Sequence, residues 1–425
     1  MLPRLALRDL VLAVLALWAA APRTGRAQQA GPTADAASGI SLLAARAAAA
    51  ARAPDVTLAR SREEIARAQV DVAGALANPT VTLTTAQKTA RLGTGLSLPV
   101  PLFGQRATAV GAARSDADAA GLEVEATRYE ARWSATLAWL DLWEAQERAR
   151  LLADAAADAA HVATIADEKF KAGTAARVEV LRTGADRERA RAEAALAAAV
   201  VPAAAARLAI AVGPGGGGTR WVATGRPDLA LAEADLVALQ RGTTDHPILR
   251  WDRARIAAGA AHVRAEQRAR WPVITADVTA NWNDPSLPGN DLIGGLSFEA
   301  PVLNLRSGAI ARARAEQKLA ETTAETDQRR LAAALVDALG RAAGAGERAR
   351  ILADSVLPAL DQAWRMNEEG YRDGRVDLLR LLDAQRVRLE TRIAVVEAEA
   401  AWQRALADVE RAAGVSLGGG GVHAP

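Results

Sequence analysis

The chain has 425 residues, of which 50% are hydrophobic but only 4% are aromatic, and it has no cysteine. This composition favours long helices over a compact aromatic core, and the lack of cysteine excludes disulfides, thiolate metal sites and an acylated N-terminal cysteine. The formal net charge of +2 falls to about −1 once residues 1–27, with four arginines and one aspartate, are removed, so the charge gives no support for nucleic acid binding.

Residues 1–27 have the pattern of a secretory signal peptide. Arg4 and Arg8 precede an apolar run, and small residues flank Arg26 at the expected cleavage point. Beyond this segment we expect no membrane-spanning helix, because alanine-rich stretches such as residues 44–51 are short and interrupted by charge. Any membrane attachment would therefore use strands.

The first structural repeat is expected over residues 28–213. Two helices, at 39–53 and 55–77, precede a strand hairpin at about 79–101 with alternating apolar and polar residues. A long helix follows at about 104–168, and a return helix at about 177–212 ends at Gly213. Pro202 lies inside the return helix, where a kink is expected.

Residues 214–228 are interpreted as a linker, because no Lys-Ser or Lys-Thr follows the glycine tract as a phosphate loop would require. The second structural repeat is expected over residues 229–414, and residues 415–425 form a tail. The predicted elements of the second repeat are short helices at the start, a strand hairpin at about 272–302, a long helix at about 306–368 and a return helix at about 376–413. Three glycines and Pro358 are expected to soften the long helix.

The two halves repeat one plan in register. Four positions in the first half each precede a matching position by 201 residues, namely Phe170 and Tyr371, Gly173 and Gly374, Leu181 and Leu382, and Gly213 and Gly414. The segment 97–106 likewise matches 297–306 at an offset of 200. A unit of about 200 residues therefore occurs twice.

Alternation in the second hairpin predicts one lipid-facing and one water-facing side. Ala276 and Val278 are expected to face lipid, and Asp277 and Thr279 the lumen of a barrel. Four strands cannot close a barrel, and open edges in lipid leave backbone groups unsatisfied. Three chains would supply twelve strands, so a homotrimer is expected.

These features together resemble the TolC-type outer-membrane efflux proteins over nearly the whole mature chain. The signal peptide, the duplicated plan, Asn78-Pro79, and Tyr371-x-x-Gly374 followed by residues 382–385 (LDAQ) carry the resemblance. Residues 102–106 (LFGQR) and 246–249 (HPIL) are most similar to the branch that serves cobalt-zinc-cadmium efflux pumps.

The resemblance implies a mainly helical fold with a small β part. Long antiparallel helical hairpins would form a trimeric α-barrel in the periplasm, continued by a twelve-stranded β-barrel in the outer membrane of a Gram-negative cell. The implied partners are outer-membrane lipid, a periplasmic adaptor and an inner-membrane resistance-nodulation-division pump.

No constellation in the sequence supports catalysis, and no cofactor or metal site is expected. The HExxH and GxSxG patterns are absent, and the four histidines are isolated. His262 and Glu266 have a spacing that suits a metal, but a pair on a charged helix is interpreted as surface. The chain is not expected to be an enzyme.

The candidate site residues lie mostly at the helical turns. The resemblance implies a periplasmic gate narrowed by acidic side chains. Asp383 matches one of these acidic positions and Arg380 occupies another, and their equivalents in the first half are Glu179 and Arg182. Arg380 is expected to pair with Glu179. Ordinary surface ion pairs are the alternative. The candidates for the tip turns and adaptor contacts are Gly173, Gly374, Tyr371 and Asp377, and those for the membrane-interface aromatics are Phe103, Trp271 and Trp282.

The sequence thus predicts a passive outer-membrane exit duct of a tripartite efflux system that exports heavy-metal cations. A duct for drug efflux or type I protein secretion is the nearest alternative, because the same tube serves both. A soluble periplasmic adaptor with a helical hairpin is the alternative of another class. The two amphipathic strand hairpins and the full duplication weigh against it.

Overall fold

The computed structural model describes residues 38–85, 92–214, 221–230, 239, 245–282, 291–299, 301 and 303–417. The expected signal peptide, 1–27, lies outside the described residues. So does the expected short helix at 229–240, apart from residues 229, 230 and 239.

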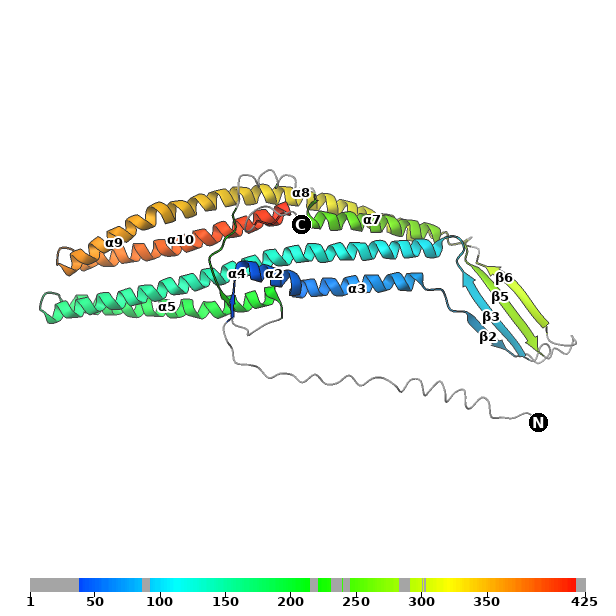
Figure 1. Cartoon of the computed structure of the whole chain (residues 1–425), viewed down its shortest axis with the longest axis horizontal. Helices are drawn as coiled ribbons and strands as arrows, with labels where there is room; N and C mark the ends of the chain where they lie inside the picture. Colours follow the sequence, from blue (N-terminus) through cyan, green and yellow to red (C-terminus); the bar gives the residue numbers. More distant parts are fainter. Residues whose placement is uncertain are drawn as a thin grey trace, which may run out of the picture.

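The molecule is an elongated, gently curved layer of helices with a β-sheet at one end (Figure 1). In the first repeat the elements are α2 (Leu42–Arg52), α3 (Pro54–Gly74), β2 (Thr80–Thr84), β3 (Leu92–Val100), α4 (Gln105–Lys171) and α5 (Arg177–Val212). In the second they are α7 (Pro247–Arg268), β5 (Ile274–Trp282), β6 (Asp291–Phe298), α8 (Ser307–Ile351), the π-helix η2 (Leu352–Val356), α9 (Leu357–Arg372) and α10 (Leu378–Ala413).

Helix α4 lies in the middle of the layer. It packs against α3 and α5 on one side and against α7 and α10 on the other, and α8 packs beyond α7 and α10. The two turns at the end farthest from the sheet join α4 to α5 and α9 to α10 (Figure 1). We call this end the tip.

In each repeat the return helix ends against the start of the helix that leads to the sheet. Gly213 and Gly414 end α5 and α10 with φ of +83° and +76°, in the region that favours glycine. A β-carbon at Gly213 would lie 2.0 Å from the carbonyl oxygen of Arg52, and one at Gly414 would lie 2.8 Å from Cδ2 of His246. The helices that follow these contacts begin with Pro54 and Pro247, which suit a first turn.

The two strand hairpins form one antiparallel sheet in the order β2-β3-β5-β6. Val278 lies opposite Leu96, and Asp277 opposite Ser97, so the two sides of the sheet differ as the alternation predicted. Asp277 accepts hydrogen bonds from Ser97 and, at 2.7 Å, from Ser297 on the polar side. Strands β2 and β6 have no further partner within the described part of one chain, so the sheet is open at both edges.

The main core lies between the tip and the sheet, and we call it the equatorial core. Trp139, Leu140, Leu208 and Leu406 are among its fully buried side chains. Two three-residue strands, β1 (Ser38–Ile40) and β4 (Trp221–Ala223), pair in parallel beside it. The indole N–H of Trp139 donates to the carbonyl of Ile40 at 2.9 Å.

Two boundary expectations are corrected by this core. The segment 214–228 is not only a linker, because it contributes β4, and the first residues of the expected tail pack inside, since Val415 and Leu417 are buried. Both segments are too short to carry a periodic pattern, and their partners are far away in the sequence.

Two expectations about helices also change. The long helix predicted at 306–368 is interrupted by η2, just before Pro358. Within the described residues α5 is long and apolar enough, by length and composition, to cross a membrane, so the expectation that the alanine-rich stretches are short does not hold for this helix. Its C-terminal half is mostly alanine and valine, and it packs along α4 and continues as an α-helix through Pro202.

Candidate functional site

The two tip turns have the same backbone geometry. Gly173 and Gly374 both adopt a positive φ, +76° and +75°, at the ends of α4 and α9. Each turn is closed by an amide that bonds back to a helical carbonyl, from Thr174 at 2.9 Å in the first and from Arg375 at 2.8 Å in the second. This geometry explains why both glycines recur in the repeat.

Asp377 caps the helix that follows the second turn. Its carboxylate accepts from the amide of Arg380 at 2.8 Å, which satisfies a free donor at the start of α10. Asp377 is a candidate for the tip turns and adaptor contacts, and its position just before the helix could also have predicted this cap.

Tyr371 connects the two halves of the tip. Its side chain is only 3% exposed and packs with Val162 and Leu381. Its hydroxyl donates to Oε2 of Glu179 at 3.4 Å, and Nζ of Lys169 lies 4.0 Å from the centre of its ring. Burial and the neighbouring Glu179 carboxylate raise the pKa of Tyr371, so the hydroxyl stays protonated and can donate.

The other gate candidates are not brought together into one cluster within one chain. Glu179 faces Tyr371, Asp383 forms an ion pair of 2.8 Å with Arg386, and no ion pair joins Arg380 to Glu179 among the described residues. Arg182 and Asp383 both line a groove of about 1110 Å³ between α4, α5 and α10.

A second set of contacts between the halves lies farther from the turns. Arg388 of α10 pairs with Asp361 at 2.6 Å and Asp158 at 3.6 Å, and it stacks 4.3 Å above the ring of Trp364. Burial is the largest influence on the Asp158 carboxyl and raises its pKa. This cluster is not among the sites predicted from the sequence. In the sequence, Trp364 and Arg388 are equally far from Val376, which lies in the turn between α9 and α10. Antiparallel pairing of these two helices could therefore have predicted their contact.

The aromatic candidates lie at opposite ends of the sheet. Phe103 and Trp271 stack with ring centres 5.6 Å apart where the helices meet the strands. The amide of Gln105 donates to the carbonyl of Trp271 at 3.2 Å and holds this junction together. Trp282 ends β5 at the other end of the sheet, and its indole N–H donates to Thr94 at 3.1 Å.

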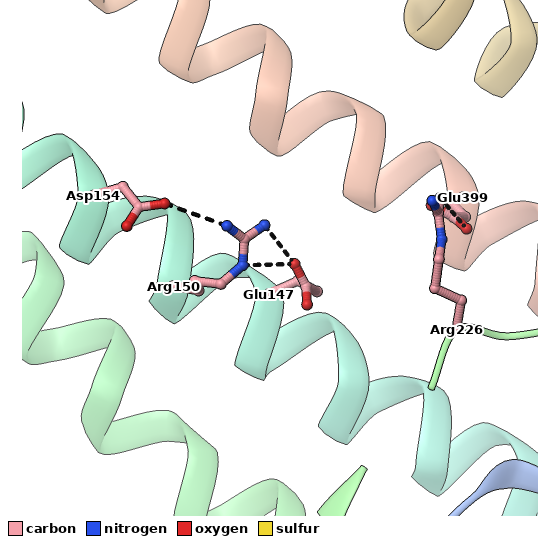
Figure 2. Close-up of polar contacts among 5 residues, drawn as sticks. All are labelled: Glu147, Arg150, Asp154, Arg226 and Glu399. Carbon is pink, nitrogen blue, oxygen red and sulfur yellow. Dashed lines mark hydrogen bonds and ion pairs between the residues drawn. The ribbon is translucent and has the colours of Figure 1, made fainter. Parts of the chain in front are cut away.

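Many ion pairs lie on the exposed surface of the helices between the tip and the sheet. In Figure 2, Arg150 bridges Glu147 and Asp154 along α4 at 2.8 and 3.3 Å, while Arg226 reaches Glu399 of α10 at 2.8 Å. Exposed pairs of this kind contribute about 1 kcal/mol or less each. The Arg226 pair attaches the segment after β4 to α10.

The histidines and acidic residues do not form a metal centre in the part of the chain that the structure describes, where no three such side chains are grouped to hold an ion. His262 pairs with Asp116 at 2.8 Å, and Glu266 with Arg306 at 2.7 Å, so the spaced pair on α7 has separate partners. The candidate functional features in the described residues are thus the contacts between helices and the amphipathic sheet.

Comparison with known proteins matches this architecture. The family model described as outer membrane efflux protein covers residues 45–214 and 226–415. The cobalt-zinc-cadmium resistance protein CzcC of Cupriavidus metallidurans is 24% identical over 317 residues, which span 72% of this chain and 73% of CzcC.

Solved structures agree in fold. The crystal structure of CusC superposes with a TM-score of 0.72 at 16% identity, covering 88% of this chain and 92% of CusC. The CmeC outer membrane channel of Campylobacter jejuni superposes with a TM-score of 0.70 at 16% identity, covering 88% of this chain and 85% of CmeC. Since the family model covers both repeats, this chain belongs to the outer membrane efflux protein family.

Proposed function

We propose that the protein is a passive channel in the outer membrane, the exit duct of a tripartite efflux system, and that it exports heavy-metal cations. Its partners would be a periplasmic adaptor and an inner-membrane resistance-nodulation-division pump. The observation that carries the proposal is the amphipathic four-stranded sheet at one end of a duplicated helical layer, in a chain whose two repeats both match the efflux family. Similarity to a cobalt-zinc-cadmium resistance protein supports the metal substrate.

Assembly as a homotrimer would complete the tube. The free edges of β2 and β6 need partners in lipid, where unpaired backbone groups are costly. The helical layer also has two open sides, along α3 and α5 and along α8 and α9. Large apolar side chains are exposed on these helices, among them Ile65, Leu196, Ile210, Leu319, Val336 and Met366. Three chains joined edge to edge would cover both kinds of surface and give twelve strands.

The tip would act as the periplasmic gate. The Tyr371–Glu179 contact would hold the two hairpins of each chain together, and copies of Arg380, Asp383 and Arg182 around the threefold axis would narrow the entrance. The turns at Gly173 and Gly374 would present the tip to the adaptor. In the membrane, Phe103 and Trp271 would lie at the periplasmic interface and Trp282 at the outer one.

A tolerance assay in the native bacterium tests the proposed substrate. We expect deletion of the gene to lower tolerance to cobalt, zinc and cadmium and to raise the cellular content of these metals measured by mass spectrometry. The wild-type gene should restore both, and a Val278→Arg variant, whose barrel should not assemble, should restore neither. Unchanged metal content combined with new sensitivity to organic drugs would instead favour the drug-efflux alternative.

A further inference from the structure

Three arginines lie at the sheet end of α7 without a partner. Arg264, Arg268 and Arg270 are exposed, and no hydrogen bond or ion pair joins their side chains to any residue that the structure describes. Glu266 lies between them in the sequence but pairs with Arg306 at 2.7 Å. The end of α7 therefore carries positive charge that the contacts within the chain do not neutralise.

Helical spacing brings two of these arginines to the same side as an exposed tryptophan. Arg264 and Arg268 are one turn apart on α7, and Trp271 follows after nearly another turn, with its amide bonded to the carbonyl of Arg268 at 3.0 Å. Trp271 stacks on Phe103 where the helices meet the strands. The side of α7 that carries the arginines thus ends at an aromatic pair.

Apolar side chains surround this junction. Each of the four connections between a helix and a strand has an exposed leucine or valine, and these are Leu76, Leu102, Val273, Leu303 and Leu305. Leu303 is 99% exposed, so nothing within the described part of the chain covers it. Apolar surface of this kind, next to strands with one apolar side, marks the level at which the protein enters the hydrocarbon of a membrane.

With Trp271 at the edge of the hydrocarbon, the arginines lie at the depth of the lipid headgroups. At 1.5 Å per residue, Arg268 is about 4.5 Å and Arg264 about 10 Å from Trp271 along the helix. The headgroup layer on one side of a bilayer is roughly 5–8 Å thick, and an extended arginine side chain covers the difference. The tip, where the adaptor is expected, is at the opposite end of the molecule (Figure 1).

The first repeat has no counterpart of this cluster. When the junctions 78–79 and 271–272 are aligned, the equivalents of the three arginines are Asp71, Ala75 and Ala77. A need shared by both copies of the duplicated fold would place arginines in both, so these arginines serve a property of the second repeat alone. Each chain has one such cluster.

We propose that Arg264, Arg268 and Arg270 bind the phosphate groups of anionic phospholipids in the periplasmic leaflet of the outer membrane, beside the ring of Trp271. The inference rests on the proposed channel function, because a sheet in the outer membrane brings lipid to this end of α7. Guanidinium groups suit phosphate, to which they donate two parallel hydrogen bonds. Glu299, exposed after β6, offsets one charge and leaves the cluster cationic.

Native mass spectrometry of the purified protein measures the lipid preference directly. Dioleoylphosphatidylglycerol and dioleoylphosphatidylcholine have the same acyl chains but differ in the charge of the headgroup. We expect the protein to retain one molecule of the anionic lipid per chain and to bind the zwitterionic lipid much more weakly. Equal retention of the two lipids would overturn the proposal.

Replacing the cluster tests its role. The triple variant Arg264→Gln, Arg268→Gln, Arg270→Gln should bind phosphatidylglycerol roughly 100-fold more weakly, since each arginine near an anionic surface strengthens binding about fivefold. Unchanged affinity would contradict the assignment. Heat-resistant oligomer on gels shows whether the variant assembles, and the wild-type comparison of the two lipids stands even if it does not.

A matched control removes the same charge far from the sheet. Its three arginines are also exposed and also have no ion pair among the described residues, and the changes are Arg177→Gln, Arg348→Gln and Arg365→Gln. This control should bind phosphatidylglycerol like the wild type. An equal loss of binding in both triple variants would show that only the net charge of the protein matters, and would refute a site on α7.

Inorganic phosphate separates a lipid site from a site for free anions. Phosphate in excess over lipid should not displace phosphatidylglycerol, because it lacks the acyl chains that lie beside the apolar junction. Displacement by phosphate at concentrations equal to the lipid would mean that the arginines bind free anions, and would overturn the lipid assignment.

Bilayer conductance of the wild type separates this proposal from the proposed channel. A wild type that prefers phosphatidylglycerol but does not conduct would refute the channel and leave the lipid site. A conducting wild type without lipid preference would refute the lipid site and leave the channel.

Discussion

At the residue scale, Tyr371 is the side chain that most directly joins the two halves of the tip. We predict that Tyr371→Phe, which keeps the ring, its burial and the contact with Lys169 but removes the hydrogen bond to Glu179, raises the frequency of channel openings in planar bilayers. One such bond to a charged partner is worth roughly 1.5–3 kcal/mol. Glu188→Gln, an exposed change on α5 away from the tip, is the control, and equal opening by both variants and wild type would remove Tyr371 from the gate.

His246 should make the equatorial core sensitive to acid. It is fully buried, it accepts from the amide of Ile248 at 3.1 Å and it contacts the carbonyl of Arg411 at 2.8 Å, and burial lowers its pKa. At acid pH the unfolded chain therefore binds a proton at His246 that the folded chain does not bind. The free energy of unfolding falls as the pH drops below about 6.5, the usual histidine pKa.

We therefore expect the melting temperature of the wild type to fall more between pH 7 and pH 5 than that of His246→Asn. Asparagine preserves an N-cap acceptor but does not titrate, so the variant should have a flatter pH dependence. It should be less stable at pH 7, because it loses the contact with the carbonyl of Arg411. Parallel pH profiles for the two proteins would show that other groups cause the acid sensitivity.

At the scale of the elements, the junctions between stacked helices depend on the terminal glycines. Gly213→Ala should destabilise the fold by roughly 2–4 kcal/mol, because the new methyl group would clash with the carbonyl of Arg52 in a backbone region unfavourable to alanine. Gly184→Ala, inside α5 and facing open space, should be neutral or stabilising by up to about 1 kcal/mol. Chemical denaturation of both variants measures the difference, and equal midpoints would argue against the close junction.

The sheet provides a second comparison between neighbouring positions. Val278→Arg should destabilise the assembled protein by roughly 2–4 kcal/mol, because a charge would face lipid, whereas Thr279→Arg on the polar side should be tolerated. The yield of heat-resistant oligomer on gels reports the outcome. Similar yields from both variants would mean that neither side faces lipid, and a lower yield from Thr279→Arg would mean that the two sides are exchanged.

At the scale of the whole molecule, the open sheet edges and open sides of the helical layer predict a trimer. Light scattering in mild detergent should give a protein mass of roughly three times that of the chain without its signal, with the strand content retained. A stable monomer with intact strands would contradict the barrel.

The sequence by itself determined the repeat, the order of long helices and hairpins, and the side of the sheet on which each strand residue lies. These properties come from local signals that repeat along the chain, such as the turn glycines Gly173 and Gly374 and the two-residue alternation around Asp277. The match of Tyr371 with Phe170 marked the tip, although it did not show which residue each would contact.

Only the tertiary structure decided the pairing of β1 with β4, the burial of Val415 and Leu417, and the contact of Tyr371 with Glu179. Each of these joins segments that are either too short to have a periodic pattern or far apart in the chain, so no local preference encodes them. Pro358 indicated a weak point in the helix, but the missing N–H by itself does not specify whether the backbone breaks, kinks or widens into the π-turn η2.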